Sequence, residues 1–197
     1  MIAVVTSELY RFATIRSVWV SVIVVMVAAY AVSFFGAPFW GLVVGMGTFA
    51  ITANVVGSQF SHRTVVLTYL ARPNRLVVLA GQIVASALVG AFIALASAIG
   101  VRNEPDLIVD GLVAVPLIAI FAAALATVVR RPLWLILGFV GWLIIGEGVI
   151  GQLDYPLPLT TFLRAITGDS EQLGWFCAWT AGALAVAVLL SRRDVTD

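Results

Sequence analysis

Few side chains in this sequence have the chemistry of a catalytic or transport site, and Glu147 is the strongest candidate among them. It is the one acid inside an apolar stretch, between Gly146 and Gly148. A carboxylate inside a bilayer is costly, so such residues are functional candidates. The alternative is a water-exposed position near the end of a helix, and the sequence leaves both interpretations open. Asn54 is the other polar residue at depth, and for it we favour a structural hydrogen bond.

The residue types that are missing exclude several kinds of chemistry. All 11 basic residues are arginine, which excludes a P-loop, whose lysine reaches the nucleotide phosphates, and a Schiff base. With one cysteine and one histidine, the chain can form no internal disulfide and is expected to hold no metal. We expect Cys177 to be a small buried hydrophobe and His62 to be a surface residue. The chain is therefore not expected to be an enzyme or to bind a cofactor itself.

The elements that position these residues are set by an extreme composition. Of the 197 residues, 62% are hydrophobic and only 11% are charged, whereas soluble domains are about 25% charged. The mean hydropathy is +1.10. These values exclude a disordered chain, a nucleic-acid-binding domain and an ordinary soluble enzyme, and they predict an integral membrane protein.

Six apolar stretches are long enough to cross a bilayer, since about 20 helical residues span its ~30 Å core. Residues 17–57 contain no charge, which is twice the length of one span, and Gly36 and Pro38 mark a tight turn in the middle. Phe34, Phe35, Phe39 and Trp40 flank this turn, as aromatic residues do at a membrane interface. We predict an all-α polytopic protein, a single domain over residues 1–197, with spans at about 17–36, 39–57, 76–101, 110–129, 133–151 and 172–191.

The arginines predict the orientation of the spans. If both termini are cytoplasmic, nine arginines fall on the cytoplasmic side and only Arg102 and Arg164 fall outside. This is a strong positive-inside bias. High Ala, Val and Arg content without lysine is typical of a GC-rich bacterium. We therefore expect a multi-pass protein of the bacterial cytoplasmic (inner) membrane.

Two segments outside the spans have amphipathic periodicity. Residues 1–16 place Ile2, Val5, Leu9 and Phe12 on one stripe, with Glu8 and Arg11 largely off it, which predicts an interfacial helix. Residues 152–171 predict a short outer helix that re-enters the membrane only if protein or water covers its backbone. In that helix an apolar face (Leu159, Phe162, Leu163, Ile166) lies opposite a polar one (Thr160, Thr161, Arg164, Thr167).

The loop between the second and third spans predicts a further helix at 58–70. Phe60, Thr64, Leu67 and Leu70 can form one face, Ser58 or Ser61 can cap its start, and Pro73 ends it. A short helix with an apolar face at the cytoplasmic surface requires a partner groove. In the second span, Gly41 and Gly45 form a GxxxG pair that allows close helix approach.

This loop resembles the first cytoplasmic loop of the membrane subunits of type-2 ABC exporters. The matching positions are Arg63, Thr64, Leu67, Leu70, Pro73 and Arg75. The motif covers about residues 57–82, and the six-span layout and the outer helical insert are similar as well. The sequence departs from the family at two positions, because the family's acidic residue is Gln59 here and its lysine is Gln82.

The resemblance implies a permease subunit of an ATP-driven exporter. Two permease copies, identical or different, would pair in the membrane above separate ABC ATPase subunits that bind ATP and Mg²⁺. Helix 58–70 would be the coupling helix, with Phe60, Arg63, Thr64, Leu67 and Leu70 at the contact. The cargo path would lie between the two copies, lined by spans one, two and five. An apolar interior with few charges favours an amphiphilic or lipid-like cargo.

Two other classes of protein stay open from the sequence. A secondary transporter usually has internal repeats and midplane ionisable residues, and here only Glu147 qualifies. A non-transporting membrane scaffold or assembly subunit is the second alternative. Co-purification of a nucleotide-binding partner distinguishes the exporter from both.

Overall fold

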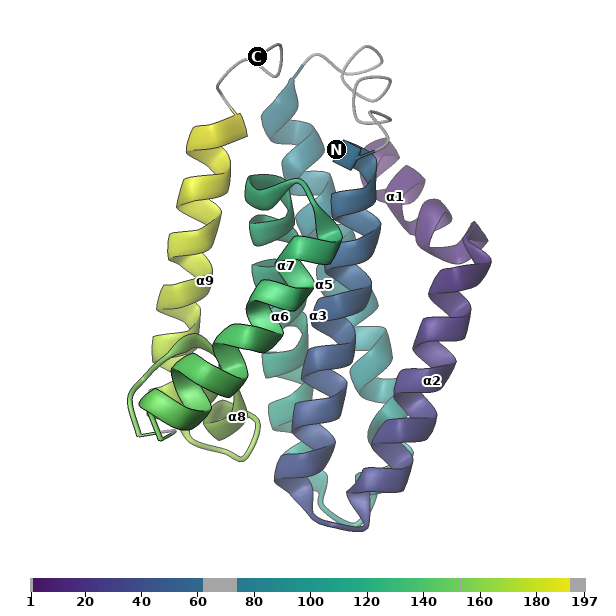
Figure 1. Ribbon diagram of the computed structural model, residues 1–197. Coiled ribbons are helices and arrows are strands. Elements are labelled where there is room, and N and C mark those ends of the chain that lie inside the picture. The colour runs from purple at the N-terminus through teal and green to yellow at the C-terminus, as the bar shows by residue number, and fades with distance from the viewer. Residues whose placement is uncertain (1, 62–73, 153, 192–197) are drawn as a thin grey trace.

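The computed structural model describes residues 2–61, 74–152 and 154–191, and every regular element in these ranges is a helix (Figure 1). Six helical segments are long and apolar enough to cross a membrane, which confirms the all-α polytopic prediction. They are α2 (Arg16–Ser33), α3 (Ala37–Ser61), α5 (Arg75–Ser97) with the 3₁₀ turn η1 (Ala98–Val101), α6 (Pro105–Val129), α7 (Pro132–Gly141) with the π-helix η2 (Trp142–Ile150), and α9 (Ser170–Ser191). Two shorter helices are α1 (Ile2–Thr14) and α8 (Pro158–Ala165).

The two ends of the bundle differ in what they carry. Helix α1 and the last turn of α9 lie at one end, at the top of Figure 1, which we call the terminal end. The α2–α3 turn and α8 lie at the opposite end, which we call the far end. The start of α1 and the end of α9 thus lie at the same end of the bundle.

Helix α6 is the centre of the bundle and packs against α3, α5 and α9. Small side chains make this packing close, because Ala122, Ala123 and Ala124 are each fully buried. A Cβ on Gly90 of α5 would lie only 3.0 Å from the Ala119 Cβ of α6. The helix begins at Pro105, five residues before the predicted start, since an acid in the first turn of a helix is favourable there.

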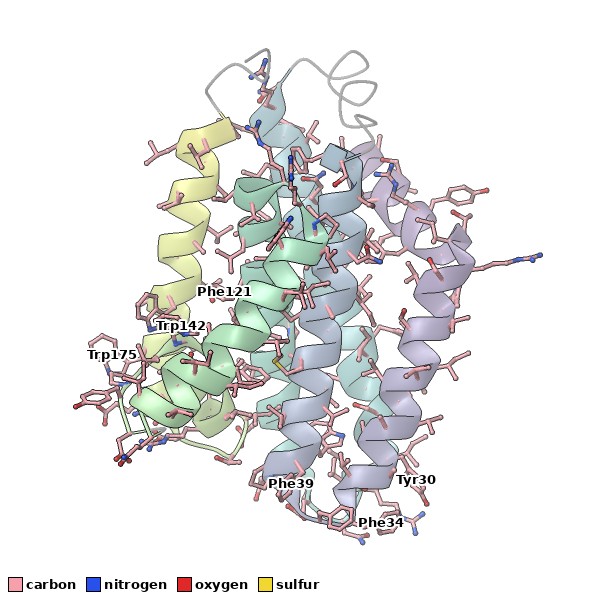
Figure 2. The ribbon with its side chains drawn as sticks, viewed as in Figure 1. Tyr30, Phe34, Phe39, Phe121, Trp142 and Trp175 are labelled. Atoms are coloured by element: carbon pink, nitrogen blue, oxygen red, sulfur yellow. The ribbon has the colours of Figure 1, made fainter. Side chains whose placement is uncertain are left out.

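A chain of phenylalanine rings joins α6 to the outer helices. The Phe49 ring of α3 stacks on Phe139 of α7 with centroids 3.8 Å apart, and Phe121 of α6 lies 6.2 Å from Phe139. On its other side Phe121 lies 6.0 Å from Phe176 of α9, which contacts Phe162 of α8 at 5.5 Å. Figure 2 shows Phe121 in the middle of the bundle. These offset and edge contacts fix five helices around one core.

The α2–α3 turn forms where the sequence predicts it, but one of its aromatic residues is not at an interface. Gly36 has a φ of +119°, the left-handed region that favours glycine, and Phe34, Phe35 and Phe39 are exposed. Trp40 is fully buried, and its indole Nε1 donates to the Ser97 carbonyl oxygen at 3.2 Å. Its place in the aromatic belt was therefore a wrong prediction.

Helix α1 is present as predicted, but the face that it buries is different. Val4, Glu8 and Phe12 are the buried residues of α1, whereas Val5 and Leu9 are only half-buried. The helix packs on α5 at Gly81, where any Cβ would overlap Val4. Glu8 is thus in the middle of the buried stripe and not off it, because a hydrogen bond from Gln59 of α3 offsets its burial.

Candidate functional site

Three buried polar side chains join α1, α3 and α5 at the terminal end. The Gln59 Nε2 of α3 donates to the Glu8 Oε2 of α1 at 2.8 Å, and the Gln82 Nε2 of α5 donates to the Gln59 Oε1 at 2.8 Å. Their exposed fractions are 4% for Glu8, 1% for Gln59 and 3% for Gln82. Buried polar groups that satisfy one another specify one arrangement of the elements that carry them. We call Glu8, Gln59 and Gln82 the terminal network.

Burial raises the pKa of Glu8 above its ordinary value of 4.5, opposed by the charge of Arg11 and by the hydrogen bond from Gln59. Arg11 Nη1 lies 3.9 Å from the Glu8 Oε2. Because the raised pKa makes the folded protein bind more protons than the unfolded chain, stability falls as the pH rises from 4.5 through the raised pKa. The terminal network therefore holds α1 more tightly in acid than at neutral pH.

A glutamine at position 8 should remove this pH dependence. In Glu8→Gln the side-chain oxygen still accepts from Gln59, but no charge is buried, so we expect a higher Tm at pH 7.5 and a flatter Tm between pH 5 and pH 7.5. Glu8→Leu is the matched control, because it leaves the buried Gln59 donor without its acceptor and should lower the Tm at every pH. Thermal unfolding of the purified protein in mild detergent measures both, and equal pH slopes in wild type and Glu8→Gln would contradict the assignment.

An apolar groove of about 350 Å³ opens on the surface between α2, α3 and α7. It is lined by Val24, Val25 and Ala28 of α2, Val43, Met46, Gly47, Phe49 and Ala50 of α3, and Ile136 and Val140 of α7. We call it the side groove. The floor is close to the bundle core, because Phe49 stacks on Phe139 beneath it. These helices are the first, second and fifth spans.

Asn54 lies on the same face of α3 as the side groove, one turn beyond Ala50 towards the terminal end. Its side chain is exposed and makes no hydrogen bond to any residue that the structure describes. The predicted structural hydrogen bond of Asn54 is therefore not formed among the described residues, and it stays a prediction for contacts beyond them. An amide without a hydrogen-bond partner is unfavourable in lipid. We therefore expect water or another protein molecule to contact this face of α3.

Glu147 lies in the wide π-helical turns of η2 and is fully buried. Its Oε1 accepts from the Trp142 indole Nε1 and the Leu159 backbone N–H, both at 3.0 Å. Its Oε2 accepts from the Thr160 backbone N–H and, at 2.8 Å, from the Thr160 hydroxyl. The carboxylate thus accepts from the unpaired backbone N–H groups at the start of α8, and its burial contradicts the water-exposed alternative.

Helix α8 has no solvent-facing polar side in its first turns. Leu159, Phe162 and Ile166 are buried as predicted, but Thr160 and Thr161 are buried too, because Glu147 and the Pro158 carbonyl accept their hydroxyls. The glycine pair of α3 accommodates this helix. A Cβ on Gly41 would lie 2.6 Å from Ile166, and one on Gly45 would overlap the Phe162 ring.

The predicted coupling residues are only in part within the described chain. Phe60 lies in the last turn of α3, half-buried, with the Arg130 guanidinium carbon 6.0 Å from its ring centroid. Residues 58–61 continue α3, so a separate helix does not begin at Ser58. Arg63, Thr64, Leu67 and Leu70 lie outside the described residues, as does His62.

No metal centre is found in the part of the chain that the structure describes. Among those residues, no group of three or more His, Cys, Asp or Glu side chains is placed to hold a metal ion. Cys177 is exposed and not buried as predicted, because α9 turns Phe176, Thr180 and Ala187 towards the bundle. The terminal network is the feature that sequence reasoning missed, since its members are far apart in the chain.

The fold and these sites define the class as a multi-pass, all-α membrane protein with six spans. Comparison of the chain with protein-family models, curated proteins and solved structures finds no match in any of the three. The residues of the chain themselves therefore carry the case for its function.

Proposed function

We propose that this protein is the permease subunit of an ATP-driven exporter of the type-2 ABC class, with ATP hydrolysed by a separate subunit. The observation that carries the proposal is the contact between Gln59 and Gln82. These are the two positions where the sequence departs from the family pattern of an acid and a lysine. Their amides meet at 2.8 Å, so the two positions at which the family has an acid and a lysine are in contact between α3 and α5.

The terminal end has the parts that an ATPase contact requires. The terminal network ties α1 to both helices that flank residues 62–73, the segment that carries the coupling motif. Movement of that segment by an ATPase would therefore be passed to α1, α3 and α5 together. A ligand-driven change needs contacts that differ between two states, and contacts of the ATPase with this segment of the chain would supply them.

The arginines support a cytoplasmic location for this end. Among the described residues, five arginines lie at the terminal end and two at the far end. The terminal group is Arg11, Arg16, Arg75, Arg130 and Arg131. By the positive-inside rule the terminal end then faces the cytoplasm, where ATP is available to the partner subunit, and the membrane is the bacterial inner membrane.

The side groove supports pairing with a second permease copy. It is formed by the first, second and fifth spans, the spans expected to line the cargo path, and Asn54 beside it is an exposed amide. A second copy against this face would cover the amide and enclose a largely apolar path. Such a path favours an amphiphilic or lipid-like cargo over an ion or a sugar.

A pull-down of the tagged chain in mild detergent from its source cells tests the proposal. We expect ATPase activity in the eluate of the wild type and its loss, by tenfold or more, with Leu67→Asp, which puts a charge on the apolar face of the coupling helix. Leu189→Asp is the matched control, because it makes the same substitution at an exposed leucine in the last turn of α9, at the same end, and should keep the ATPase. An eluate without any nucleotide-binding partner would overturn the proposal in favour of a secondary transporter or a membrane scaffold.

A further inference from the structure

An open cleft of about 520 Å³ lies at the far end between η2 and α9. Four aromatic side chains from three segments line it, together with Ile150 and Leu157. They are Trp142 of η2, Tyr155 of the following loop, and Trp175 and Trp179 of α9. Figure 2 shows Trp142 and Trp175 beside each other at the left edge of the bundle. We call this the aromatic cleft.

Hydrogen bonds hold two of the indoles with their polar edges turned to the protein. Trp142 Nε1 donates to the Glu147 carboxylate at 3.0 Å, and Trp179 Nε1 donates to the Pro156 carbonyl oxygen at 2.9 Å. Both rings still remain 42–49% exposed, as does Trp175. Two of the three indole rings that line the cleft are therefore held in place, with their N–H groups already used.

Two acidic side chains lie close to these rings, Glu147 at the indole N–H of Trp142 and Glu171 one turn from Trp175 on α9. The indole Nε1 of Trp142 donates to the Glu147 carboxylate, which is fully buried. Glu171, Trp175 and Trp179 follow one another at intervals of four residues, so they share one face of α9. Glu171 is exposed and stands one turn beyond Trp175, at the end of α9 that faces away from the membrane centre.

We propose that the aromatic cleft binds the quaternary ammonium group of a cationic amphiphile. A cation over the face of tryptophan is attracted by the ring quadrupole, most strongly where water is excluded. An ammonium group with N–H donors would require hydrogen-bond acceptors, which indole rings do not supply. A quaternary ammonium has no such donors, and its alkyl chain extends along the apolar surface of η2 and α9.

The cation is what separates this proposal from an ordinary aromatic belt. Tryptophan and tyrosine gather at membrane interfaces without binding a particular ligand, and a belt of that kind would accept charged and uncharged molecules of one shape equally. The test therefore compares a cation with its carbon isostere. It uses the isolated protein, so its outcome does not depend on the ATPase or on transport.

The experiment titrates the full chain in dodecyl maltoside with hexanoylcholine and with its uncharged isostere 3,3-dimethylbutyl hexanoate, by isothermal titration calorimetry. We expect saturable binding of hexanoylcholine about tenfold tighter than that of the isostere. Trp175→Leu should abolish the preference, and Glu171→Gln, a surface change that leaves folding intact, should reduce it about threefold. Trp134→Leu is the control, because Trp134 is an exposed tryptophan on α7, away from the cleft, and should keep the preference.

Three results would overturn the proposal. The first is equal affinity for the two probes, the mark of an interfacial belt only. The second is a preference that survives both Trp175→Leu and Glu171→Gln, which would place the cation elsewhere. The third is the absence of saturable binding of either probe at millimolar concentration.

Discussion

Replacing Glu147 with alanine is expected to lower the free energy of unfolding by about 3 kcal/mol or more. The carboxylate accepts four hydrogen bonds, from Trp142, from Leu159 and twice from Thr160. The deletion leaves these donors without partners in a site that is fully buried. In a chain of this size the loss corresponds to a Tm lower by about 6–12 °C, read from thermal unfolding in mild detergent.

Two further variants test whether the loss of stability in Glu147→Ala comes from the four hydrogen-bond donors that contact the carboxylate. Glu147→Gln keeps the shape but replaces one acceptor oxygen by an NH₂ group that faces N–H donors, so it should be nearly as damaging as alanine. Glu104→Gln removes an exposed acid at the same far end and should change the Tm by less than about 2 °C. A Tm within that margin for Glu147→Ala would show that the carboxylate does not hold α8, which would make it available for a transport role.

A methyl group at Gly45 is expected to destabilise the protein by about 1–3 kcal/mol. The new Cβ would overlap the ring of Phe162, and that ring is fully buried and packs against Phe176, so a shift of the ring would disturb the core. The expected result of Gly45→Ala is therefore a lower Tm and exposure of α8 to proteolysis. Protease digestion of the folded protein followed by mass spectrometry locates the cut near Pro158–Ala165.

The chain offers its own control for this substitution. A Cβ on Gly138 meets nothing within 4 Å, so Gly138→Ala should be neutral or stabilising, by up to about 1 kcal/mol from helix propensity. The double variant Gly45→Ala, Phe162→Leu replaces the ring with a smaller side chain and should recover part of the lost stability. A double-mutant cycle measures this recovery. Equal effects of alanine at both glycines would show that α8 does not pack on α3 in this way.

The close contact at Gly45 also changes the interpretation of the GxxxG pair. Such pairs commonly join two membrane-spanning helices, but Gly41 and Gly45 accommodate the side chains of α8, which does not span the membrane. Glu147 anchors the first turn of α8 and these glycines accommodate its apolar face. The far end is therefore built around a short helix between the fifth and sixth spans.

The sequence alone determined the class of the fold and most of the helices. The length of an apolar stretch without charge is a local property, so hydropathy located all six spans, and Gly36 marked the turn between two of them. Amphipathic periodicity located α1 and α8 for the same reason. The ends of α3 and α6 were less predictable, because polar residues such as Gln59 and Asp106 continue a helix wherever neighbouring helices or the helix dipole favour them.

The tertiary structure alone decided which face of each helix is buried. In a membrane protein the core and the lipid-facing surface are both apolar, so hydropathy could not separate the buried Trp40 from the exposed Phe39. The partners of polar groups were equally hidden, since Glu8 and Gln59 are 51 residues apart and Gln59 and Gln82 are 23 apart. Such contacts exist only once α1, α3 and α5 are packed together, and for that reason the terminal network could not be found from any one segment of the sequence.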